Sequence, residues 1–425
     1  MRVPFQDADP AASCRADPPS QTAGMNITAL QFGLYRDGDN NLDTVQSPVI
    51  DQAFRVSAED GRIAIDVEDT TARRDLIEDG GKRTESYDIR DGQIVNRPQI
   101  DPPHDPSSRV NLARFVDRTL DAALQNGAGQ TWLDLVDHGG GDGGGLENGR
   151  GAIMSSTDMA GAIADGIAMH AQEHPEDAGR GIDGVVANQC LMSTLGFADA
   201  LSQDGVKYLV ASPETMLAPG TPTSVAEDIA KHVDDPAAMA KAVVKDVMHT
   251  HYAMPGIGSY TPAAAMNVLD LDPQKIGTMR AAVKSLDHAL TTAAKGSAEA
   301  RAAILRDAES VDGMVRFDES GLPWHADRPA IALYDAFAAD PRLSNDVRAA
   351  AAGASKAVSD LVLAHGESNG FAEFGGIDYS DAAGPTVHFA TERSELDPWA
   401  PKVTETHTAF YKEVGAAKLD RALLA

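Results

Sequence analysis

Short apolar runs and longer amphipathic stretches alternate along the first half of the chain. The runs are bounded by glycine or charged residues, which predicts buried strands. The predicted strands are residues 27–35, 62–67, 132–136, 184–187 and 206–211. Residues 85–98 alternate polar and apolar positions around Asp91-Gly92, which predicts a hairpin at the margin of a sheet.

The stretches between these strands carry apolar residues at helical spacing. Residues 111–124 predict a helix that stops at Gly127, and residues 158–172 predict a helix capped by Asp158. A third predicted helix is 195–201. Strands that alternate with helices predict an α/β fold, in which a mostly parallel sheet is covered on both faces.

Beyond Pro222 the pattern becomes alanine-rich and helical. Ser224–Glu227 has the form of a capping box that opens one helix, and Asp235-Pro236 separates this helix from the next. Longer helices are predicted at 273–294, 344–364 and 404–424, with a returning strand at 386–390.

The chain therefore divides into three expected parts. Residues 1–24 predict a disordered tail, residues 25–222 an α/β core, and residues 223–425 a helix-rich region whose late strand near 386–390 joins the core. The tail lacks the apolar stretch of a secretory signal, so we expect a cytoplasmic protein or export by a non-classical route. No apolar run approaches the length of a membrane span.

Two predicted strands end in residues with reactive side chains. His138 follows the strand at 132–136, and Cys190 follows the strand at 184–187, 52 residues after His138. Ligands of an open α/β sheet bind at the carboxyl ends of parallel strands. A thiol and an imidazole there suit a cysteine hydrolase, although a lone cysteine after an apolar strand is also often a small buried hydrophobe. Position alone leaves both interpretations open.

The motifs around these residues resemble the clostripain family of cysteine peptidases, which share the caspase, legumain and gingipain fold. The similar segments are Tyr35-Arg-Asp-Gly-Asp-Asn-Asn-Leu-Asp43, Leu133-Asp-Leu-Val-Asp-His-Gly-Gly-Gly141, Gln189-Cys-Leu-Met-Ser193, Lys207-Tyr-Leu-Val-Ala-Ser212 with Glu214, and Gly384-Pro-Thr-Val-His-Phe389. They occur in the family's order over residues 25–390.

The resemblance implies a caspase-like sheet with a helical C-terminal extension that returns a late strand. It also implies a cysteine endopeptidase acting on protein or peptide substrates, with Cys190 as nucleophile and His138 as general acid/base. The N–H groups of Gly139 and Cys190 would form the oxyanion hole. No cofactor is required, and a catalytically silent caspase-fold module that binds a protein partner is the alternative.

The substrate pocket departs from the family's pattern. Family members usually carry an acid two positions before the nucleophile, which selects Arg or Lys, and this chain has Asn188 there. Pro213 also replaces the first acid of a Glu-Glu pair and leaves Glu214. An amide does not supply the charge that a buried guanidinium needs, so we expect weakened basic selectivity, with Glu214 as the first candidate for another pocket acid.

Three further segments raise questions of processing and metal binding. The glycine run 139–145 predicts a mobile loop, and Arg150 between two glycines is a candidate processing site. Some family members depend on calcium, but Asp37–Asp43 lacks the Gly and Glu of an EF-hand loop. His170 and His174 are spaced i, i+4 on a predicted helix, which fits either half of a metal site or a solvated helix face. We predict the solvated face and no metal site.

Composition narrows the range of partners. The chain has 425 residues, with 64 Asp and Glu against 36 Lys and Arg, for a net charge of −28. This charge argues against binding to nucleic acid or to an anionic membrane. The two cysteines, Cys14 and Cys190, exclude a disulfide framework. The oligomeric state is not readable from the sequence.

Overall fold

The structure of the protein is a computed structural model, which describes most of the chain from residue 28 onward. The described residues are 28–38, 40, 42–72, 82–96, 99–101, 104–254, 258–261, 263, 265–311, 327–367, 382–393 and 409–424. The predicted tail, residues 1–24, and Cys14 lie outside them.

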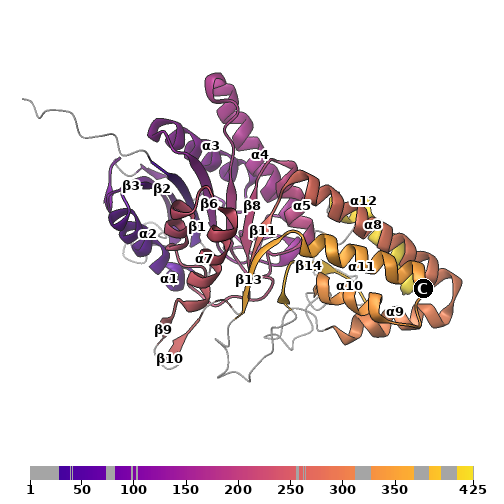
Figure 1. The fold of residues 1–425 in the computed structure, drawn as a ribbon. Coiled ribbons are helices and arrows are strands. Elements are labelled where there is room, and N and C mark those ends of the chain that lie inside the picture. Colours follow the sequence, from indigo (N-terminus) through magenta and orange to yellow (C-terminus); the bar gives the residue numbers. More distant parts are fainter. Residues whose placement is uncertain are drawn as a thin grey trace, which may run out of the picture.

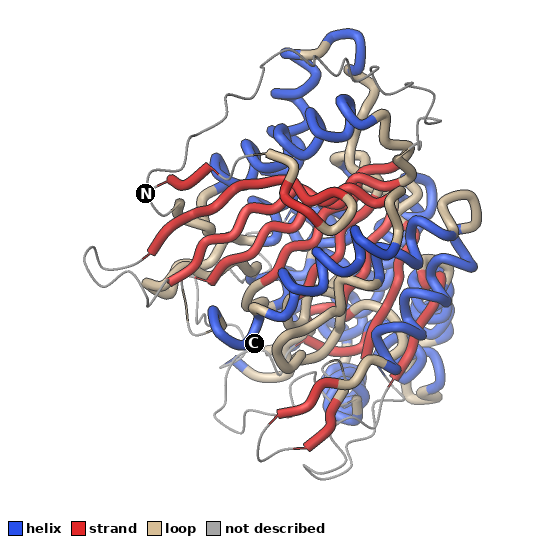
Figure 2. The backbone as a smooth tube through the Cα atoms, turned by 90° about the vertical axis from the view of Figure 1, so that its left-hand side faces the viewer, coloured by secondary structure: helices blue, strands red, loops and turns tan. Residues whose placement is uncertain are grey.

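A ten-stranded sheet crosses the described part of the molecule (Figure 2). Its strand order is β13-β11-β8-β7-β6-β1-β2-β3-β4, with β5 paired to β3. Neighbouring strands from β8 to β2 run parallel, and the strands beyond them pair antiparallel. The strands are β1 Leu30–Gly38, β2 Ile63–Ala72, β3 Lys82–Arg90, β4 Gln93–Ile94, β5 Gln99–Asp101, β6 Gln130–Val136, β7 Gly184–Asn188, β8 Tyr208–Ala211, β11 Ala265–Asp270 and β13 Val362–Glu367.

Alternating side chains of the parallel strands enter two separate apolar cores. In β6, Leu133 and Leu135 pack with the helices of one face, whereas Trp132 and Val136 pack with those of the other. Side chains of successive strand residues point to opposite faces, and all four of these are buried. The mostly parallel sheet covered on both faces, predicted from the sequence, is therefore confirmed.

Each face has its own set of helices. One face is covered by α3 Arg109–Asn126, α4 Ser156–Glu173 and α5 Leu195–Gln203. The other is covered by α2 Pro48–Glu59, α6 Val225–Lys231 and α7 Pro236–His249. The short helix α1 Asp43–Gln46 precedes α2, and two 3-10 turns occur at Gly141–Gly143 and Pro175–Asp177. Within the described residues, no helix has both the length and the apolar character to cross a membrane.

The C-terminal helices lie together to one side of the sheet, continuous with the core that α5 covers (Figure 1). They are α8 Pro273–Gly296, α9 Ala298–Ser310, α10 Ala330–Ala339, α11 Asn345–Ser359, α12 Ala409–Val414 and α13 Ala416–Leu423. Gly415, in the left-handed region with φ 98°, divides the predicted closing helix into α12 and α13.

The region after residue 222 also completes the sheet. Strand β11 pairs with β8, and β13 pairs with β11, so a boundary at 222 does not separate the sheet from the helices. The predicted helix 344–364 was wrong at its end, because α11 stops at Ser359 and β13 follows. Short apolar segments do not distinguish strand from helix by pattern alone.

The late strand β14, Thr386–His388, lies outside the ten-stranded sheet. It pairs with β12, Asp327–Pro329, in a two-stranded sheet, and β9 Tyr252–Met254 pairs with β10 Gly258–Tyr260 in another. An isolated bridge joins Thr386 to Thr194, and the N–H of Thr386 donates to the carbonyl of Ser193 over 2.8 Å. The side chain of Val387 lies in the apolar core that α5 covers, so β14 packs on the core without pairing with the ten-stranded sheet.

Two predicted helix caps were wrong in detail. The hydroxyl of Ser155, not Asp158, caps α4 by accepting from the N–H of Asp158. Ser224 does not cap α6, because its hydroxyl donates to Asp246 Oδ2 over 2.6 Å. The predicted break at Asp235-Pro236 is confirmed, and Asp235 caps α7 by accepting from the N–H of Ala238.

Candidate active site

The register of two adjacent parallel strands brings His138 and Cys190 to one edge of the sheet. Val136 of β6 pairs with Asn188 of β7, and the N–H of Asp137 donates to the carbonyl of Asn188 over 3.4 Å. His138 and Cys190 each follow two residues beyond that pair. Neighbouring strands lie about 4.8 Å apart, so the two segments leave the sheet side by side.

Gly139 holds the two segments in direct contact. A Cβ at this position would come within 2.2 Å of the carbonyl oxygen of Cys190 and 2.9 Å of its nitrogen. No other residue type fits without moving the backbone, because these neighbouring atoms are main-chain atoms. The glycine after His138 is therefore required by the close approach to the segment that carries Cys190, residues 189–193.

The thiol of Cys190 lies half-buried against the backbone of Met216. Its Sγ accepts from the N–H of Met216 over 3.3 Å and lies 3.6 Å from the carbonyl of the same residue. Burial raises the pKa of the Cys190 thiol, and the N–H of Met216 opposes this rise. The negative charge of Asp137 raises this pKa further, and the backbone groups of Cys190 and Gly139 lower it.

Residues 189–193 are held in a fixed conformation by the segment that follows β8. Leu191 adopts the left-handed conformation with φ 65°, which is uncommon for a residue other than glycine. Its N–H donates to the carbonyl of Glu214 over 3.1 Å, and the N–H of Ser193 donates to the carbonyl of Ser212 over 3.0 Å. These bonds fix the turn that presents Cys190.

The imidazole of His138 is half-buried. Burial lowers the pKa of His138, and the negative charge of Glu147 opposes that change. The preceding Asp137 accepts from Asn40 Nδ2 over 2.6 Å, and the same amide group donates to the carbonyl of Glu147 over 2.9 Å. Asn40 thus fastens the turn after β1 to the His138 segment, a role that the sequence motif did not reveal.

The glycine loop, residues 139–146, is packed rather than mobile, which corrects the prediction from its composition. Residues 140–146 are buried. Gly145 and Met154 exchange backbone hydrogen bonds of 2.9 and 2.8 Å. Gly144 has φ 110°, and a Cβ there would lie 1.8 Å from the carbonyl oxygen of Met154. Glycine permits close packing here instead of motion.

Asp142 anchors this loop to a helix near the C-terminus. The phenol of Tyr411, on α12, donates to Asp142 Oδ2 over 2.6 Å, and the hydroxyl of Thr194 donates to Oδ1. Tyr411 also accepts from the N–H of His388 over 2.8 Å. Burial raises the pKa of Asp142 to about 6, with the charge of Asp327 as the next cause. No sequence signal linked these residues, which are far apart in the chain.

The two expected pocket residues are both buried. Asn188 is 2% exposed, and its amide is used by one neighbour: Oδ1 accepts from the N–H of Thr221 over 2.7 Å, and Nδ2 donates to its carbonyl over 3.0 Å. A Cβ on Gly220 would lie 1.9 Å from Asn188 Oδ1. Glu214 is 1% exposed. The pocket roles of Asn188 and Glu214 stay predictions.

Arg150 lies on an exposed turn, in contrast to the glycine loop before it. Gly149, Arg150 and Gly151 are exposed. Asn148 organises the turn, because its Oδ1 accepts from the N–H groups of Arg150 and Ala152 over 3.0 and 3.1 Å.

The segment considered as a calcium loop, Asp37–Asp43, lies partly outside the described residues. These exclude Asp39, Asn41 and the side chains of Asp37 and Asp43.

The arrangement of strands and site defines the class of fold to which the chain belongs. It has the caspase-like fold of the C11, clostripain-like cysteine proteases, which confirms the fold that the motifs imply. A secreted C11 protease from Bacteroides thetaiotaomicron, iotapain, superposes with a TM-score of 0.58 at 15% identity, over 91% of this chain and 99% of the other.

Two further solved structures have the same fold. A secreted C11 protease from Bacteroides thetaiotaomicron in complex with an irreversible peptide inhibitor gives a TM-score of 0.61 at 13% identity, over 91% of this chain and 98% of the other. An inactive zymogen C11 protease from Parabacteroides distasonis gives 0.56 at 15%, with the same shares. No family model and no curated protein sequence matches the chain.

Proposed function

We propose that the protein is a cysteine endopeptidase, with Cys190 as nucleophile and His138 as general acid/base. The observation that carries the proposal is the convergence at one sheet edge of the segments that carry the thiol and the imidazole, where Gly139 packs directly against the backbone of Cys190. These are the groups that acyl transfer by a thiol requires. The shared fold with C11 proteases supports the same activity.

The reaction begins with transfer of the thiol proton to His138 as Sγ attacks the carbonyl carbon of the scissile amide. The N–H groups of Gly139 and Cys190 stabilise the oxyanion of the tetrahedral intermediate. His138 then donates the proton to the leaving nitrogen, the C–N bond breaks, and a thioester remains on Cys190. Water, deprotonated by His138, attacks the thioester and releases the acid and the free thiol.

The resting pair is neutral. Burial raises the pKa of the Cys190 thiol and lowers the pKa of the His138 imidazole, so neither group is charged at neutral pH. The thiolate therefore forms during attack, after substrate has entered, instead of existing as a standing ion pair. Such a site reacts slowly with small alkylating agents near neutral pH compared with a thiolate–imidazolium pair.

The cleavage preference depends on the acid that family members usually carry two positions before the nucleophile. Asn188 takes its place in this chain. The amide of Asn188 is bound to both backbone groups of Thr221, so it has neither the charge nor the free acceptor to receive a guanidinium. We infer a preference for Arg or Lys at the cleavage position that is weaker than in enzymes with an acid there, because the remaining candidate, Glu214, is 1% exposed.

Activation by cleavage after Arg150 is the second part of the proposal. The exposed turn at residues 149–151 is accessible to a protease, whereas the packed glycine loop beside it holds the site together. A similar fold occurs in a protein described as an inactive zymogen. Intact mass of the wild type beside Cys190→Ala tests this: a clip in the wild type alone supports self-processing, and one unclipped species in both excludes it.

Peptide hydrolysis tests the activity itself. A mixture of peptides that differ at one position is incubated with the wild type and with Cys190→Ala, and products are read by mass spectrometry. We expect cleavage by the wild type alone, with products that include residues other than Arg and Lys at the cleavage position. Intact peptides in both samples, at full occupancy of folded protein, would favour the catalytically silent protein-binding module.

A further inference from the structure

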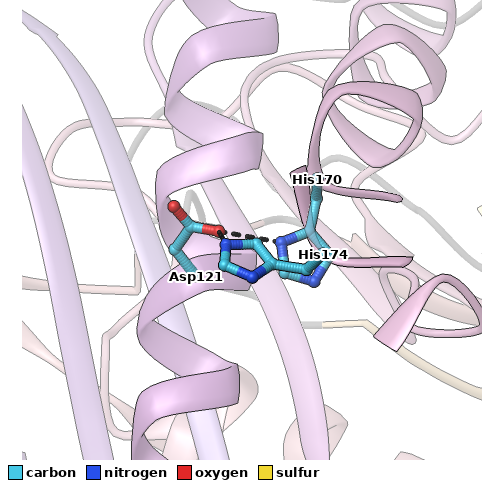
Figure 3. A group of neighbouring side chains, drawn as sticks. All are labelled: Asp121, His170 and His174. Atoms are coloured by element: carbon cyan, nitrogen blue, oxygen red, sulfur yellow. Dashed lines mark hydrogen bonds and ion pairs between the residues drawn. The ribbon is translucent and has the colours of Figure 1, made fainter. Parts of the chain in front are cut away.

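Four ionisable side chains face one another between α3 and α4, away from the active site. Asp117 and Asp121 are four residues apart on α3, and His170 of α4 is four residues before His174, the residue that ends this helix, so each pair lies on one side of its helix. Figure 3 shows the carboxylate of Asp121 reaching across to the two imidazole rings. We call these four residues the α3–α4 cluster.

The nitrogen and oxygen atoms of this cluster converge. Asp121 Oδ1 lies 2.9 Å from His170 Nδ1 and 3.2 Å from His174 Nε2. One ligand atom from each of these three residues lies within 4.8 Å of the others. His170 is wholly buried, so the solvated helix face expected from the sequence is wrong for this residue. Its ring is fixed in the helix interface.

The outward nitrogens of both rings meet other carboxylates. His170 Nε2 lies 3.2 Å from Asp177 Oδ2, and Asp177 in turn accepts from Arg180. His174 Nδ1 lies 3.4 Å from Glu176 Oε1. A carboxylate on the second ring nitrogen is the usual arrangement of a metal-binding histidine, because it fixes the tautomer that leaves the other nitrogen free to coordinate.

Asp117 supplies an independent sign of a missing ligand. Its Oδ1 is buried and has no hydrogen-bond partner among the described residues. Asp117 also lies close enough to Asp121 and Glu173 for the three carboxylates to share an ion. Buried carboxylate oxygens are nearly always paired, and a cation satisfies one that has no donor.

We propose that the α3–α4 cluster binds a divalent transition-metal ion of the Zn²⁺ type. Its ligands are His170 Nδ1, His174 Nε2 and one oxygen of Asp121, which lie within 4.8 Å of one another, and Asp117, whose carboxylate lies beside that of Asp121, completes the set. Two imidazoles and two carboxylates suit Zn²⁺ or Co²⁺, whereas Ca²⁺ and Mg²⁺ prefer oxygen ligands alone. Asp177 and Glu176 orient the rings.

The position of the site assigns it a structural role. Helix α4 begins after the active-site loop and ends before β7, and the far end of β7 carries Cys190. His170 and His174, at the end of α4, therefore lie at the opposite edge of the sheet from the thiol. An ion there joins α3 to α4 and neutralises a cluster with an excess of carboxylates, without contact with substrate.

The test uses the full chain with Cys14→Ser and Cys190→Ala, because either thiol would bind the same metals. Co²⁺ is titrated into metal-free protein and followed by visible absorption, and Zn²⁺ is titrated by calorimetry. We expect one ion per chain, a Co²⁺ spectrum typical of four-coordinate nitrogen and oxygen ligands, and a higher midpoint of thermal unfolding with Zn²⁺.

Matched variants locate the ion. His174→Ala and Asp117→Asn each remove one ligand from a half-exposed position, where the fold should tolerate the change, and circular dichroism checks that the fold is kept. Each should weaken Zn²⁺ binding at least about tenfold and abolish the thermal shift. His288→Ala, on an exposed face of α8, is the control and should bind as the parent does.

Two results would overturn the site. The first is no stoichiometric binding of either ion by the folded parent. The second is equal binding by the parent, His174→Ala and Asp117→Asn, which would place the ion elsewhere. Either result would leave the cluster as a network of His–carboxylate hydrogen bonds.

Discussion

His138 and His170 belong to the same β6–α4–β7 unit, but the two ends of this unit give the imidazole different surroundings. At the carboxyl end of β6, burial is the main influence on His138 and lowers its pKa, beside a thiol whose pKa is raised. At the end of α4, both ring nitrogens of His170 lie against carboxylates.

The difference shows how the environment decides the chemistry of a histidine. A desolvated, neutral imidazole beside a neutral thiol can take and return a proton during one reaction. An imidazole whose nitrogens are matched by carboxylates is fixed in place and suits a cation. The predictions below separate the two ends, beginning with the largest expected effect.

Removing the acid/base at the active-site end should nearly abolish activity. His138→Ala should lower kcat/KM by about 10²- to 10⁴-fold, because proton transfer to the leaving nitrogen then depends on water. Peptide hydrolysis under single-turnover conditions measures this loss, with circular dichroism as the check on folding. Activity within a factor of about two of the wild type would remove His138 from the mechanism.

The anchor of the glycine loop should produce the next largest effect. Tyr411→Phe deletes the hydrogen bond to Asp142 and leaves the carboxylate with one partner fewer, at a cost of about 1–3 kcal/mol in the free energy of unfolding. We also expect a lower kcat with little change in KM, since the loop carries Gly139. A loss of stability without any change in kcat would make Tyr411 structural only.

Asp142 should make the free energy of unfolding depend on pH. Its pKa is raised to about 6, so its neutral form is favoured by folding, and the stability it contributes is present at low pH and lost as pH rises through about 6. The loss amounts to about 3 kcal/mol. Comparing urea unfolding of the wild type and Asp142→Asn from acid to neutral pH should show this loss in the wild type alone.

The two ends of the β6–α4–β7 unit also differ in how much of their structure the sequence predicts. The strand pattern and its polar endings were enough to place His138 and Cys190 together, because parallel register carries two neighbouring strand ends to one edge. The sequence shows the i, i+4 spacing of His170 and His174. Their partner Asp121 lies on another helix, and the spacing of residues within one helix does not predict which helix packs against it.

Other features were out of reach for similar physical reasons. The glycine loop is packed because Asp142 meets Tyr411, 269 residues later, and composition alone favours a flexible loop. Strands β11 and β13 extend the sheet from within a helix-rich region, where short apolar segments fit either structure. Asn188 predicted an altered pocket from the sequence. Its hydrogen bonds to the backbone of Thr221 could not be predicted, because they depend on how the folded chain brings the two residues together.

The pH dependence of the thiol distinguishes a neutral resting pair from an ion pair. Because burial raises the pKa of Cys190, the rate of alkylation by iodoacetamide should keep rising through pH 9, without a plateau near neutrality. The acidic limb of kcat/KM should fall below pH 6.5, following the lowered pKa of His138. A pH-independent alkylation rate between about pH 5 and 8 would instead indicate a standing thiolate.

The smallest effect should come from the opposite end of the unit. His174→Ala should leave kcat/KM within about a factor of two of the wild type, because the α3–α4 cluster does not contact the strand ends that carry His138 and Cys190. Hydrolysis of the best peptide substrate measures this. A loss of activity that added Zn²⁺ restores would mean that the two ends are coupled.

The most direct test of the central claim is covalent trapping of the nucleophile. The protein is incubated with an irreversible peptidyl ketone that alkylates catalytic thiols, and intact mass with peptide mapping locates the adduct. The account predicts one adduct per chain, on Cys190, with matching loss of hydrolysis, and no adduct in Cys190→Ala. Hydrolysis that persists after full labelling, or in Cys190→Ala, would contradict it.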